Sequence, residues 1–327
     1  MAVKTMIEAI RDGLREEMER DERVFVLGED VGPRGGVFGV TDGFFKQFGG
    51  DRVMDTPLAE SVIAGAAIGA AMNGMRPVAE MQFADFSHPA MDQIMNEAAK
   101  IRYRSNNSFN VPMVIRMPYG GGIHGALYHS QSVEALYGHI PGLTVVIPSN
   151  PYDAKGLLKA AIRDPDPVIF LEHKGAYRLI KGEVPDEDYT VPLGKAAVAR
   201  EGTHMTAIAY GMMLFQCLKC AEEMAKEGVE VEVVDVRTIS PLDRETILNS
   251  VKKTGKALVV YEDNRSGGWG AEISASIAEA AFPYLDGPIV RVTGPDIPAM
   301  PYNHNQESYF MPNPEKIVKA MRELAAY

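Results

Sequence analysis

Hydrophobic and polar positions recur along the chain with the periods of helices and strands in turn. In residues 5–20, Ile7, Ile10, Leu14 and Met18 stand at helical spacing with charges between them, which predicts an amphipathic helix. Residues 24–31 are an apolar run followed by a glycine and two acids, which predicts a buried strand. The first half continues with predicted strands at 76–86 (strand and turn), 111–116, 144–148 and 167–172, and with predicted helices at 44–48, 91–103 and 152–162.

The second half repeats this alternation after a polar connector at residues 181–192. Its predicted strands are 206–210, 229–235, 257–261 and 289–292, and its predicted helices are 213–226, 244–254 and 270–280. Strands that alternate with helices indicate mainly parallel sheets with both faces covered. We therefore predict an α/β fold of two domains, residues 1–183 and a smaller domain at residues 184–327, as the length of 327 residues allows.

Glu60 stands at the start of an uncharged stretch of small residues that extends to Gly74. Pro57 precedes it, which predicts a helix that begins near Glu60. Burial would raise the pKa of this carboxyl group, which suits a group that shares a proton with a ligand. An acid in the first turn also interacts favourably with the helix dipole, so its position alone leaves both roles open. Gly65 and Gly69 share one face, and we expect this helix at a tight helix or subunit contact.

Composition and charge narrow the classes of partner. The formal net charge is −11 at pH 7, so a nucleic-acid or anionic-membrane surface, which needs clustered Lys and Arg, is not expected. The two cysteines, Cys217 and Cys220, lie within one predicted helix, which favours buried thiols over a disulfide framework. The first residues show neither a signal peptide nor a transit peptide, and we expect a cytoplasmic protein.

Two places carry candidate chemistry besides Glu60. Glu29 and Asp30 follow a predicted strand, where open α/β sheets bind ligands, although a solvated strand end is the simpler interpretation. Residues 120–132 form a glycine-rich loop that holds His124 and His129. No Cys or acid nearby in the sequence completes a zinc set with them, and no Lys-Ser or Lys-Thr follows the glycines, so neither a zinc site nor a P-loop is predicted. Proton transfer by one histidine and simple loop filling both stay open.

Several segments together resemble the beta subunit of the thiamine-diphosphate-dependent 2-oxo acid dehydrogenases. They are Leu27-Gly-Glu-Asp-Val31, Asp55-Thr-Pro-Leu-Ala-Glu60, Glu80-Met-Gln-Phe-Ala-Asp-Phe86, Lys100-Ile-Arg-Tyr-Arg104, His124-Gly-Ala-Leu-Tyr-His-Ser-Gln131, Pro151-Tyr-Asp-Ala-Lys-Gly156 and Val234-Asp-Val-Arg-Thr238. The resemblance covers essentially the whole chain in order and looks closest to the branched-chain type. It implies a pyrimidine-binding domain followed by a smaller transketolase C-terminal-like domain.

The resemblance also implies roles for five residues. Glu60 matches the acid that hydrogen-bonds the aminopyrimidine ring of thiamine diphosphate and promotes its imino tautomer. Leu58 matches a residue whose backbone contacts that ring, and Phe86 matches an aromatic packed over it. His129 matches a histidine that faces the reacting carbon when the acyl group passes to the lipoyl arm, and Glu29 matches an acid in a polar tunnel between two cofactors.

One family motif is absent from this chain. The Gly-Asp-Gly sequence that precedes the asparagine of the magnesium and diphosphate site does not occur, and in the family it lies on the alpha subunit. The resemblance therefore implies half a site, completed by the alpha subunit of an alpha2-beta2 heterotetramer with the magnesium ligands on that subunit. Related beta subunits hold a structural potassium at positions that match Val111, Met113, Val114, Ala161, Asp164 and Asp166 here; a plain acidic turn would explain the last two equally well.

The expected activity is oxidative decarboxylation of a 2-oxo acid with acyl transfer to a lipoyl arm. A pyruvate or acetoin dehydrogenase beta subunit is the alternative within the class, and a non-catalytic α/β scaffold is the alternative outside it. Ile317, Met321 and Leu324 form an apolar face on a final helix that either caps the second domain or, as the family implies, docks the dihydrolipoyl acyltransferase core.

Overall fold

The computed structural model describes residues 1–327, and the chain forms two compact units. Unit 1 comprises Met1–Tyr119 and Leu136–Leu193, and unit 2 comprises Gly120–Ala135 and Gly194–Tyr327. The glycine-rich loop therefore belongs to unit 2, although it interrupts unit 1 in the sequence. The domain boundary between residues 183 and 184 stays a prediction.

Unit 1 is built mainly on parallel strands. Its elements are β1 (Ala2–Thr5), α1 (Met6–Arg20), β2 (Val24–Gly28), α2 (Phe44–Phe48), β3 (Val53–Asp55), α3 (Glu60–Met72), β4 (Arg76–Glu80), η1 (Ala84–Ala90), the π-helical η2 (Gln93–Ala98), α4 (Ile101–Arg104), β5 (Val114–Tyr119), β6 (Thr144–Val146), α6 (Pro151–Arg163), β7 (Val168–His173), α7 (Ala176–Leu179) and β8 (Lys181–Val184). The helix α5 (Glu134–Gly138) lies where the chain re-enters the unit.

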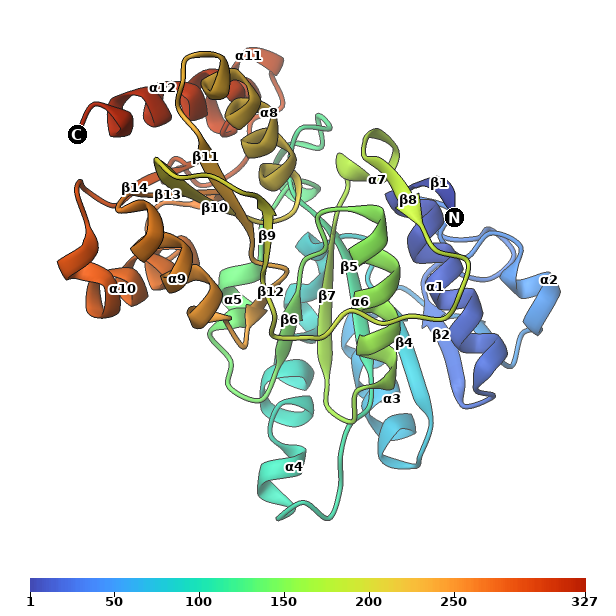
Figure 1. The fold of residues 1–327 in the computed structure, drawn as a ribbon. Helices are drawn as coiled ribbons and strands as arrows, with labels where there is room; N and C mark the ends of the chain where they lie inside the picture. Colours follow the sequence, from blue (N-terminus) through green and yellow to red (C-terminus); the bar gives the residue numbers. More distant parts are fainter. The chain divides into compact units, whose positions relative to one another are not determined.

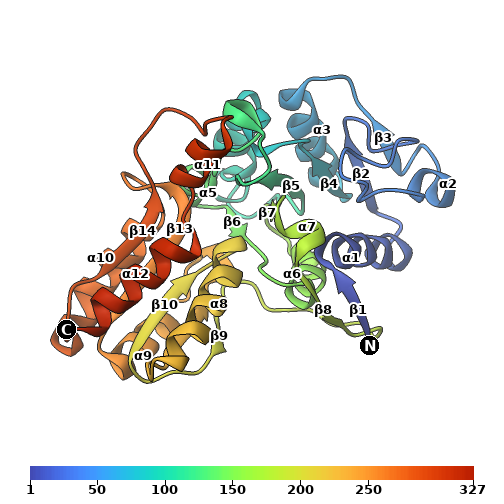
Figure 2. The same cartoon turned by 90° about the horizontal axis from the view of Figure 1, so that it is seen from above.

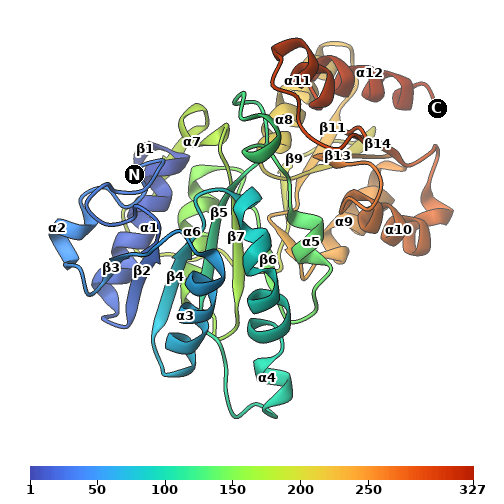
Figure 3. The ribbon, with the colours of Figure 1, turned by 180° about the vertical axis from the view of Figure 1, so that it is seen from behind.

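The sheet of unit 1 has the strand order β6-β7-β5-β4-β2-β3, and all of these neighbours pair in parallel. Helices α1 and α6 lie against each other over one face (Figure 1), and α3 lies over the other (Figure 3). Strands β2, β5 and β7 are buried along their whole length, as expected for parallel strands covered on both sides.

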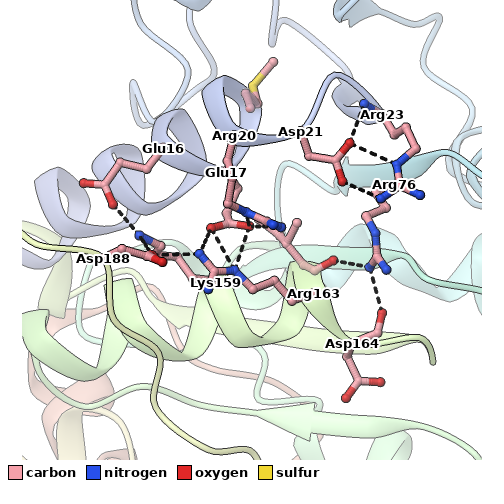
Figure 4. A network of polar contacts seen from close by, with 12 residues as sticks. Glu16, Glu17, Arg20, Asp21, Arg23, Arg76, Lys159, Arg163, Asp164 and Asp188 are labelled. Atoms are coloured by element: carbon pink, nitrogen blue, oxygen red, sulfur yellow. Dashed lines mark hydrogen bonds and ion pairs between the residues drawn. The ribbon is translucent and has the colours of Figure 1, made fainter.

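The start of α1 shows why the sequence folds locally in this way. Thr5 caps the helix, because the Glu8 amide donates to Thr5 Oγ1 while the Thr5 amide donates to the Glu8 carboxylate at 2.8 Å. Ile7, Ile10 and Leu14 are buried on the face that packs against α6 and the sheet, as the spacing predicts. A second layer of contacts joins the two helices at the solvent boundary: Glu17 of α1 accepts from Arg163 of α6 (Figure 4).

Unit 2 repeats the layered arrangement with fewer strands. Its elements are η3 (Ala126–Tyr128), β9 (Ala197–Arg200), β10 (Met205–Ala209), α8 (Met212–Lys226), β11 (Val231–Asp235), β12 (Thr238–Ser240), α9 (Arg244–Thr254), β13 (Ala257–Asn264), α10 (Gly270–Ala281), η4 (Phe282–Tyr284), β14 (Val290–Gly294), α11 (His304–Phe310) and α12 (Pro314–Ala325). The sheet order is β14-β13-β10-β11-β9, with only β9 antiparallel to its neighbour. Helices α8 and α12 lie side by side over one face, and α9 and α10 lie over the other (Figure 2).

Two predicted elements differ from those observed. The connector at residues 181–192 was expected to be loop, but β8 lies within it and pairs antiparallel with β1 at the start of the chain. The helix predicted at 91–103 is interrupted, because the π-helical turn η2 is separated from the short α4. No helix of the structure has both the length and the apolar character needed to cross a membrane.

Candidate functional site

Glu29 and Glu60 are brought together at the carboxyl edge of the sheet in unit 1. Glu29 follows β2 directly, and Glu60 is the first residue of α3. Both side chains are buried, with exposed fractions of 8% and 9%. Neither carboxylate forms an ion pair, and Glu29 Oε1 is buried without a hydrogen-bond partner. A buried acid without a partner costs stability, so this pair is a candidate for ligand binding.

The loop after β2 fixes the position of Glu29. Asp30 takes a left-handed conformation, with φ of 59°, and its carbonyl accepts a hydrogen bond from the Gly36 amide at 2.7 Å. The Gly32 amide donates to Asp55 Oδ1 at 2.6 Å, which ties this loop to the end of β3. Backbone strain at Asp30 is thus held in place by several hydrogen bonds, as is common beside functional groups.

The surroundings of Glu29 oppose its ionisation. Burial raises the pKa of Glu29, and the negative charges of Glu60 and Asp30 raise it further. A buried carboxyl group beside a second acid suits a hydrogen bond to a ring nitrogen of a ligand.

Leu58 and Phe86 lie on loops of the same unit. Leu58 precedes α3 and its side chain is 81% exposed, so nothing in this chain covers it. Phe86 lies in η1, is partly exposed, and packs edge-to-face on Phe83 with ring centroids 5.4 Å apart. An exposed apolar side chain and a partly open aromatic ring suit a flat heterocyclic ligand.

A second pair of buried acids in unit 1 has a different environment. Arg116 of β5 donates through Nε and Nη2 to both oxygens of Glu172 at 2.7 Å and through Nη1 to Glu80 at 2.6 Å. Tyr177 donates to Glu172 at 2.6 Å. All of these groups are buried, and burial raises the pKa of Glu80 although Arg116 opposes that shift. The sequence showed no sign of this cluster, because its members come from three strands and a helix.

His129 lies in unit 2, in the glycine-rich loop directly after η3, and is partly exposed. Acids of the same unit hold the start of this loop. The Gly121 amide donates to Glu262 Oε2 at 3.0 Å, and the Gly122 amide donates to Glu307 Oε1 at 2.9 Å. Glu262 and Glu307 come from β13 and α11, so elements distant in the sequence shape the histidine loop.

The end of the loop borders a polar cavity of about 140 Å³ within unit 2. Ser130, Gln131 and Ser132 line it on one side and Glu262 to Asn264 on another. Burial raises the pKa of Asp263 to about 6. Burial also raises the pKa of Glu134, whose Oε1 accepts from the Tyr210 hydroxyl at 3.0 Å. None of these acids was a candidate from the sequence, since single acids on separate elements give no local pattern.

The residues expected to hold potassium lie in unit 1, around the end of α6 and the start of β5. The Val111 carbonyl accepts from the Met113 amide at 2.8 Å. The Met113 carbonyl accepts from the Val168 amide at 3.0 Å. Asp164 Oδ1 accepts from the Asp166 amide at 2.8 Å. Arg102 pairs with Asp166, and Arg76 donates to the Asp164 carbonyl at 3.1 Å.

The donor set at this place only partly suits a monovalent cation. Carbonyl and carboxylate oxygens are the ligands that hard cations prefer. Each carbonyl retains a second lone pair, but Arg102 already pairs with the Asp166 carboxylate, and Arg76 occupies the backbone carbonyl of Asp164. Burial raises the pKa of Asp164, as desolvation of a carboxylate requires.

Comparison with known proteins gives whole-chain matches. The family models for the pyrimidine binding domain and the C-terminal domain of transketolase match residues 3–180 and 194–317. The chain is 61% identical to the 2-oxoisovalerate dehydrogenase subunit beta of Bacillus subtilis (strain 168), over 100% of both chains. It is 50% identical to the pyruvate dehydrogenase E1 component subunit beta of the same strain over 100% of both chains, and 51% identical to that of Acholeplasma laidlawii over 99% of each.

Among solved structures, a split gene transketolase in an inactive beta4 tetramer shares the fold. Its TM-score is 0.80 over 98% of each chain, and its sequence identity to this chain is 23%. The predicted α/β fold of two transketolase-type domains is thereby confirmed.

Proposed function

Because the chain belongs to the family of 2-oxo acid dehydrogenase beta subunits, with transketolase-type pyrimidine-binding and C-terminal domains, we propose that it serves a branched-chain 2-oxo acid dehydrogenase. In this proposal it is the beta subunit of the component that oxidatively decarboxylates a 2-oxo acid and passes the acyl group to a lipoyl arm. Identity to the 2-oxoisovalerate enzyme is 61%, against 50% for the pyruvate enzyme of the same strain, and this difference supports the branched-chain substrate.

The observation that carries the proposal is that Glu29 and Glu60 lie together, buried, without a cation beside them. Thiamine diphosphate, when bound, supplies an electron-accepting thiazolium to the decarboxylation. The residues of unit 1 fit its pyrimidine end. Glu60 is a buried carboxyl that holds a proton at a ring nitrogen, Glu29 lacks a partner for one oxygen, and Leu58 and Phe86 offer an apolar and an aromatic surface. A structural ion pair would need a cation beside these acids, and none is present.

An alpha subunit completes the site in this proposal and carries the magnesium ligands. Two observations support a partner at α3. Its outer face exposes Val62, Ala66 and Gly69, and nothing in this chain lies within 4 Å of a side chain added at Gly69. Val62 is 61% exposed and Leu58 lies nearby in sequence, so an apolar surface stands uncovered beside the candidate site. An alpha2-beta2 heterotetramer accounts for both features.

His129 is assigned to the acyl-transfer half of the reaction, and the C-terminal unit is assigned to the acyltransferase core. In α12, Ile317, Met321 and Leu324 are buried, so this face of the helix packs within unit 2 and is not offered to a partner. Tyr327, just after the helix, is 71% exposed, and we assign docking to this end of the chain. A cytoplasmic location is also proposed, with support from the two buried free thiols, Cys217 and Cys220. Potassium at Val111 to Asp166 is proposed on the oxygen atoms gathered there, one of whose acids, Asp166, already pairs with Arg102.

One reconstitution tests these assignments together. The chain is purified alone and with an alpha subunit of this family, and decarboxylation of branched 2-oxo acids, pyruvate and acetoin is measured with thiamine diphosphate and magnesium. We expect activity only in the mixture, highest with branched substrates and, if potassium binds, higher in KCl than in choline chloride. Preference for pyruvate or acetoin would replace the substrate assignment, and no activity with any substrate would favour a scaffold.

Two further arms of the same experiment address the partner and His129. His129→Ala should lower acyl transfer to a lipoyl domain more than decarboxylation with an artificial electron acceptor, because the residue is assigned to the transfer step. Equal losses would contradict that role. Removal of residues 325–327 should weaken binding to the acyltransferase core and leave decarboxylation unchanged; equal binding would make α12 a cap only.

A further inference from the structure

Three potential metal ligands meet in unit 2 from two distant segments. His124 comes from the glycine-rich loop, and His304 and Glu307 come from α11. One ligand atom from each lies within 4.8 Å of the others. His124 Nδ1 lies 2.7 Å from Glu307 Oε2, and the rings of His124 and His304 are 5.1 Å apart between centroids. This set could not be predicted from the sequence, because His304 and Glu307 are far along the chain from His124.

The carboxylate of Glu307 is fixed in position by the loop backbone. Glu307 is 3% exposed, and its Oε1 accepts from the amides of Gly122 at 2.9 Å and His124 at 3.2 Å. Gly122 and His124 both have positive φ, at 79° and 57°, so their amides converge on one oxygen. The other oxygen, Oε2, faces the two histidines. One carboxylate oxygen is thus held by backbone donors, while the other contacts only the imidazole of His124, a second potential ligand, and this is the usual outer arrangement around a protein metal.

We propose that His124, His304 and Glu307 bind a first-row divalent cation of the zinc type. Two imidazoles and one carboxylate are a donor set that such ions take with water in the remaining position, whereas magnesium and calcium prefer oxygen ligands throughout. The ion lies between His124 Nδ1 and Glu307 Oε2, which are 2.7 Å apart in the structure. It fastens the glycine-rich loop to α11 and so holds the segment that carries His129.

The alternative is a metal-free latch, in which Glu307 only accepts hydrogen bonds from the loop. The two accounts differ in the role of His304. In the latch this exposed side chain contributes only a ring contact with His124, so its loss should change little. In the metal site it is one of three ligands.

Zinc binding to the full-length chain, carrying no histidine tag, distinguishes the two. After removal of metal with a chelator, Zn²⁺ is titrated in competition with a chromogenic zinc indicator, and bound metal is counted by mass spectrometry. We expect one Zn²⁺ per chain and a loss of affinity of at least about a hundredfold in His304→Ala. His204→Ala is the matched control, since His204 is exposed in the same unit and its Nδ1 contacts only the Glu230 amide and the Thr203 hydroxyl, with no acid or second histidine beside it.

Two further readouts report on the ligands and the loop. With Co²⁺ in place of Zn²⁺, the wild-type chain and His204→Ala should show the visible absorption of a bound cobalt, and both His304→Ala and Glu307→Gln should lose it. Zn²⁺ should also slow proteolysis within residues 120–135 in the wild-type chain and in His204→Ala, but not in His304→Ala or Glu307→Gln. Circular dichroism without metal checks that each variant is folded. No saturable site, or equal zinc affinity in His304→Ala and His204→Ala, would overturn the proposal and leave the metal-free latch.

Discussion

Unit 1 holds two pairs of buried acids at the carboxyl ends of neighbouring parallel strands, and their surroundings are opposite. Glu80 and Glu172 share Arg116, which donates three hydrogen bonds to them, and Tyr177 satisfies a further lone pair. Glu29 and Glu60 lie one strand away, since Gly28 of β2 pairs with Glu80 of β4, and they have no cation at all. The first pair has what buried charge needs for stability. The second lacks it, and this deficit is the basis for proposing it as the ligand site.

The family roles fall on the unpaired acids and not on the paired ones. Glu60 and Glu29 are the two carboxylates assigned to the cofactor, whereas Glu80 and Glu172 carry no assigned role. In the proposed account, this chain keeps an unfavourable pair of acids where the ligand binds, and Arg116 compensates the neighbouring pair. Removing Arg116 should therefore destabilise the protein, whereas neutralising Glu29 or Glu60 should stabilise it.

Removing the shared cation should have the largest effect on stability. Arg116→Met leaves Glu80 and Glu172 buried without a counter-charge, and we expect a loss of about 3–5 kcal/mol in the free energy of unfolding. Denaturant unfolding followed by circular dichroism measures the loss. Arg34→Met is the control, because Arg34 pairs with Asp30 at the surface and should cost little. A loss below about 1 kcal/mol in Arg116→Met would mean that the cluster is not a paired structural unit.

Neutralising an unpaired acid should stabilise the protein. The pKa of Glu29 is raised in the folded chain, so the folded state holds its proton to higher pH than the unfolded chain. Stability from this group is therefore present below the unfolded pKa and is lost as pH rises through the folded pKa. Glu29→Gln should raise the unfolding temperature by a few degrees at pH 7–8 and by less at pH 4.

The neighbouring residue provides a matched control for Glu29. Asp30→Asn makes the same change in net charge, but Asp30 already pairs with Arg34, and asparagine tolerates its positive φ. We expect no gain in unfolding temperature from Asp30→Asn at neutral pH. An equal gain in both variants would show that general charge repulsion, and not the Glu29–Glu60 pair, sets the effect.

The smallest effect is expected at the surface network between α1 and α6. Asp188 is exposed and bonds to Arg163 at 2.7 Å and to Lys159 at 2.6 Å (Figure 4). The hydrogen bond from Arg163 and then that from Lys159 lower the pKa of Asp188 to about 2, so its contribution is present above the unfolded pKa and is lost as pH falls toward 2. Asp188→Asn should cost less than about 1 kcal/mol and less again in high salt. Glu17→Gln, at a fully buried member of the network, should cost more; the reverse order would contradict this ranking.

Much of the fold followed from the sequence because its signals were local. The spacing of Ile7, Ile10 and Leu14 and the cap at Thr5 determine α1, and the uncharged stretch after Glu60 determines α3. The pairing of β1 with β8 could not be predicted, since the two strands lie far apart in the sequence. In addition, β8 shows little alternation of apolar and polar residues. The loop that carries His129 was predicted as a loop, but its attachment to unit 2 depends on Glu262 and Glu307 far along the chain.

The candidate site was predictable to different degrees. The place of Glu60 at a helix start and of Glu29 at a strand end came from the sequence, and the structure adds that both are buried and unpaired. The same sequence could not distinguish them from Glu80 and Glu172. All four are acids beside apolar runs, and only the three-dimensional position of Arg116 separates the two pairs. The proposed cation site at His124 was missed because its other ligands, His304 and Glu307, come near His124 only in the folded chain.

The most direct test of the account compares Glu60→Gln with Glu80→Gln in the assembled complex. The exchange of the thiazolium hydrogen of bound thiamine diphosphate for deuterium is measured by NMR, together with assembly and thermal unfolding. The account predicts that Glu60→Gln assembles and unfolds at or slightly above the wild-type temperature but slows the exchange by roughly a hundredfold or more, as loss of an acid–base group does. Glu80→Gln should lower the unfolding temperature and leave the exchange near the wild-type rate. Unchanged exchange in Glu60→Gln would contradict the assignment of the unpaired acids to the cofactor.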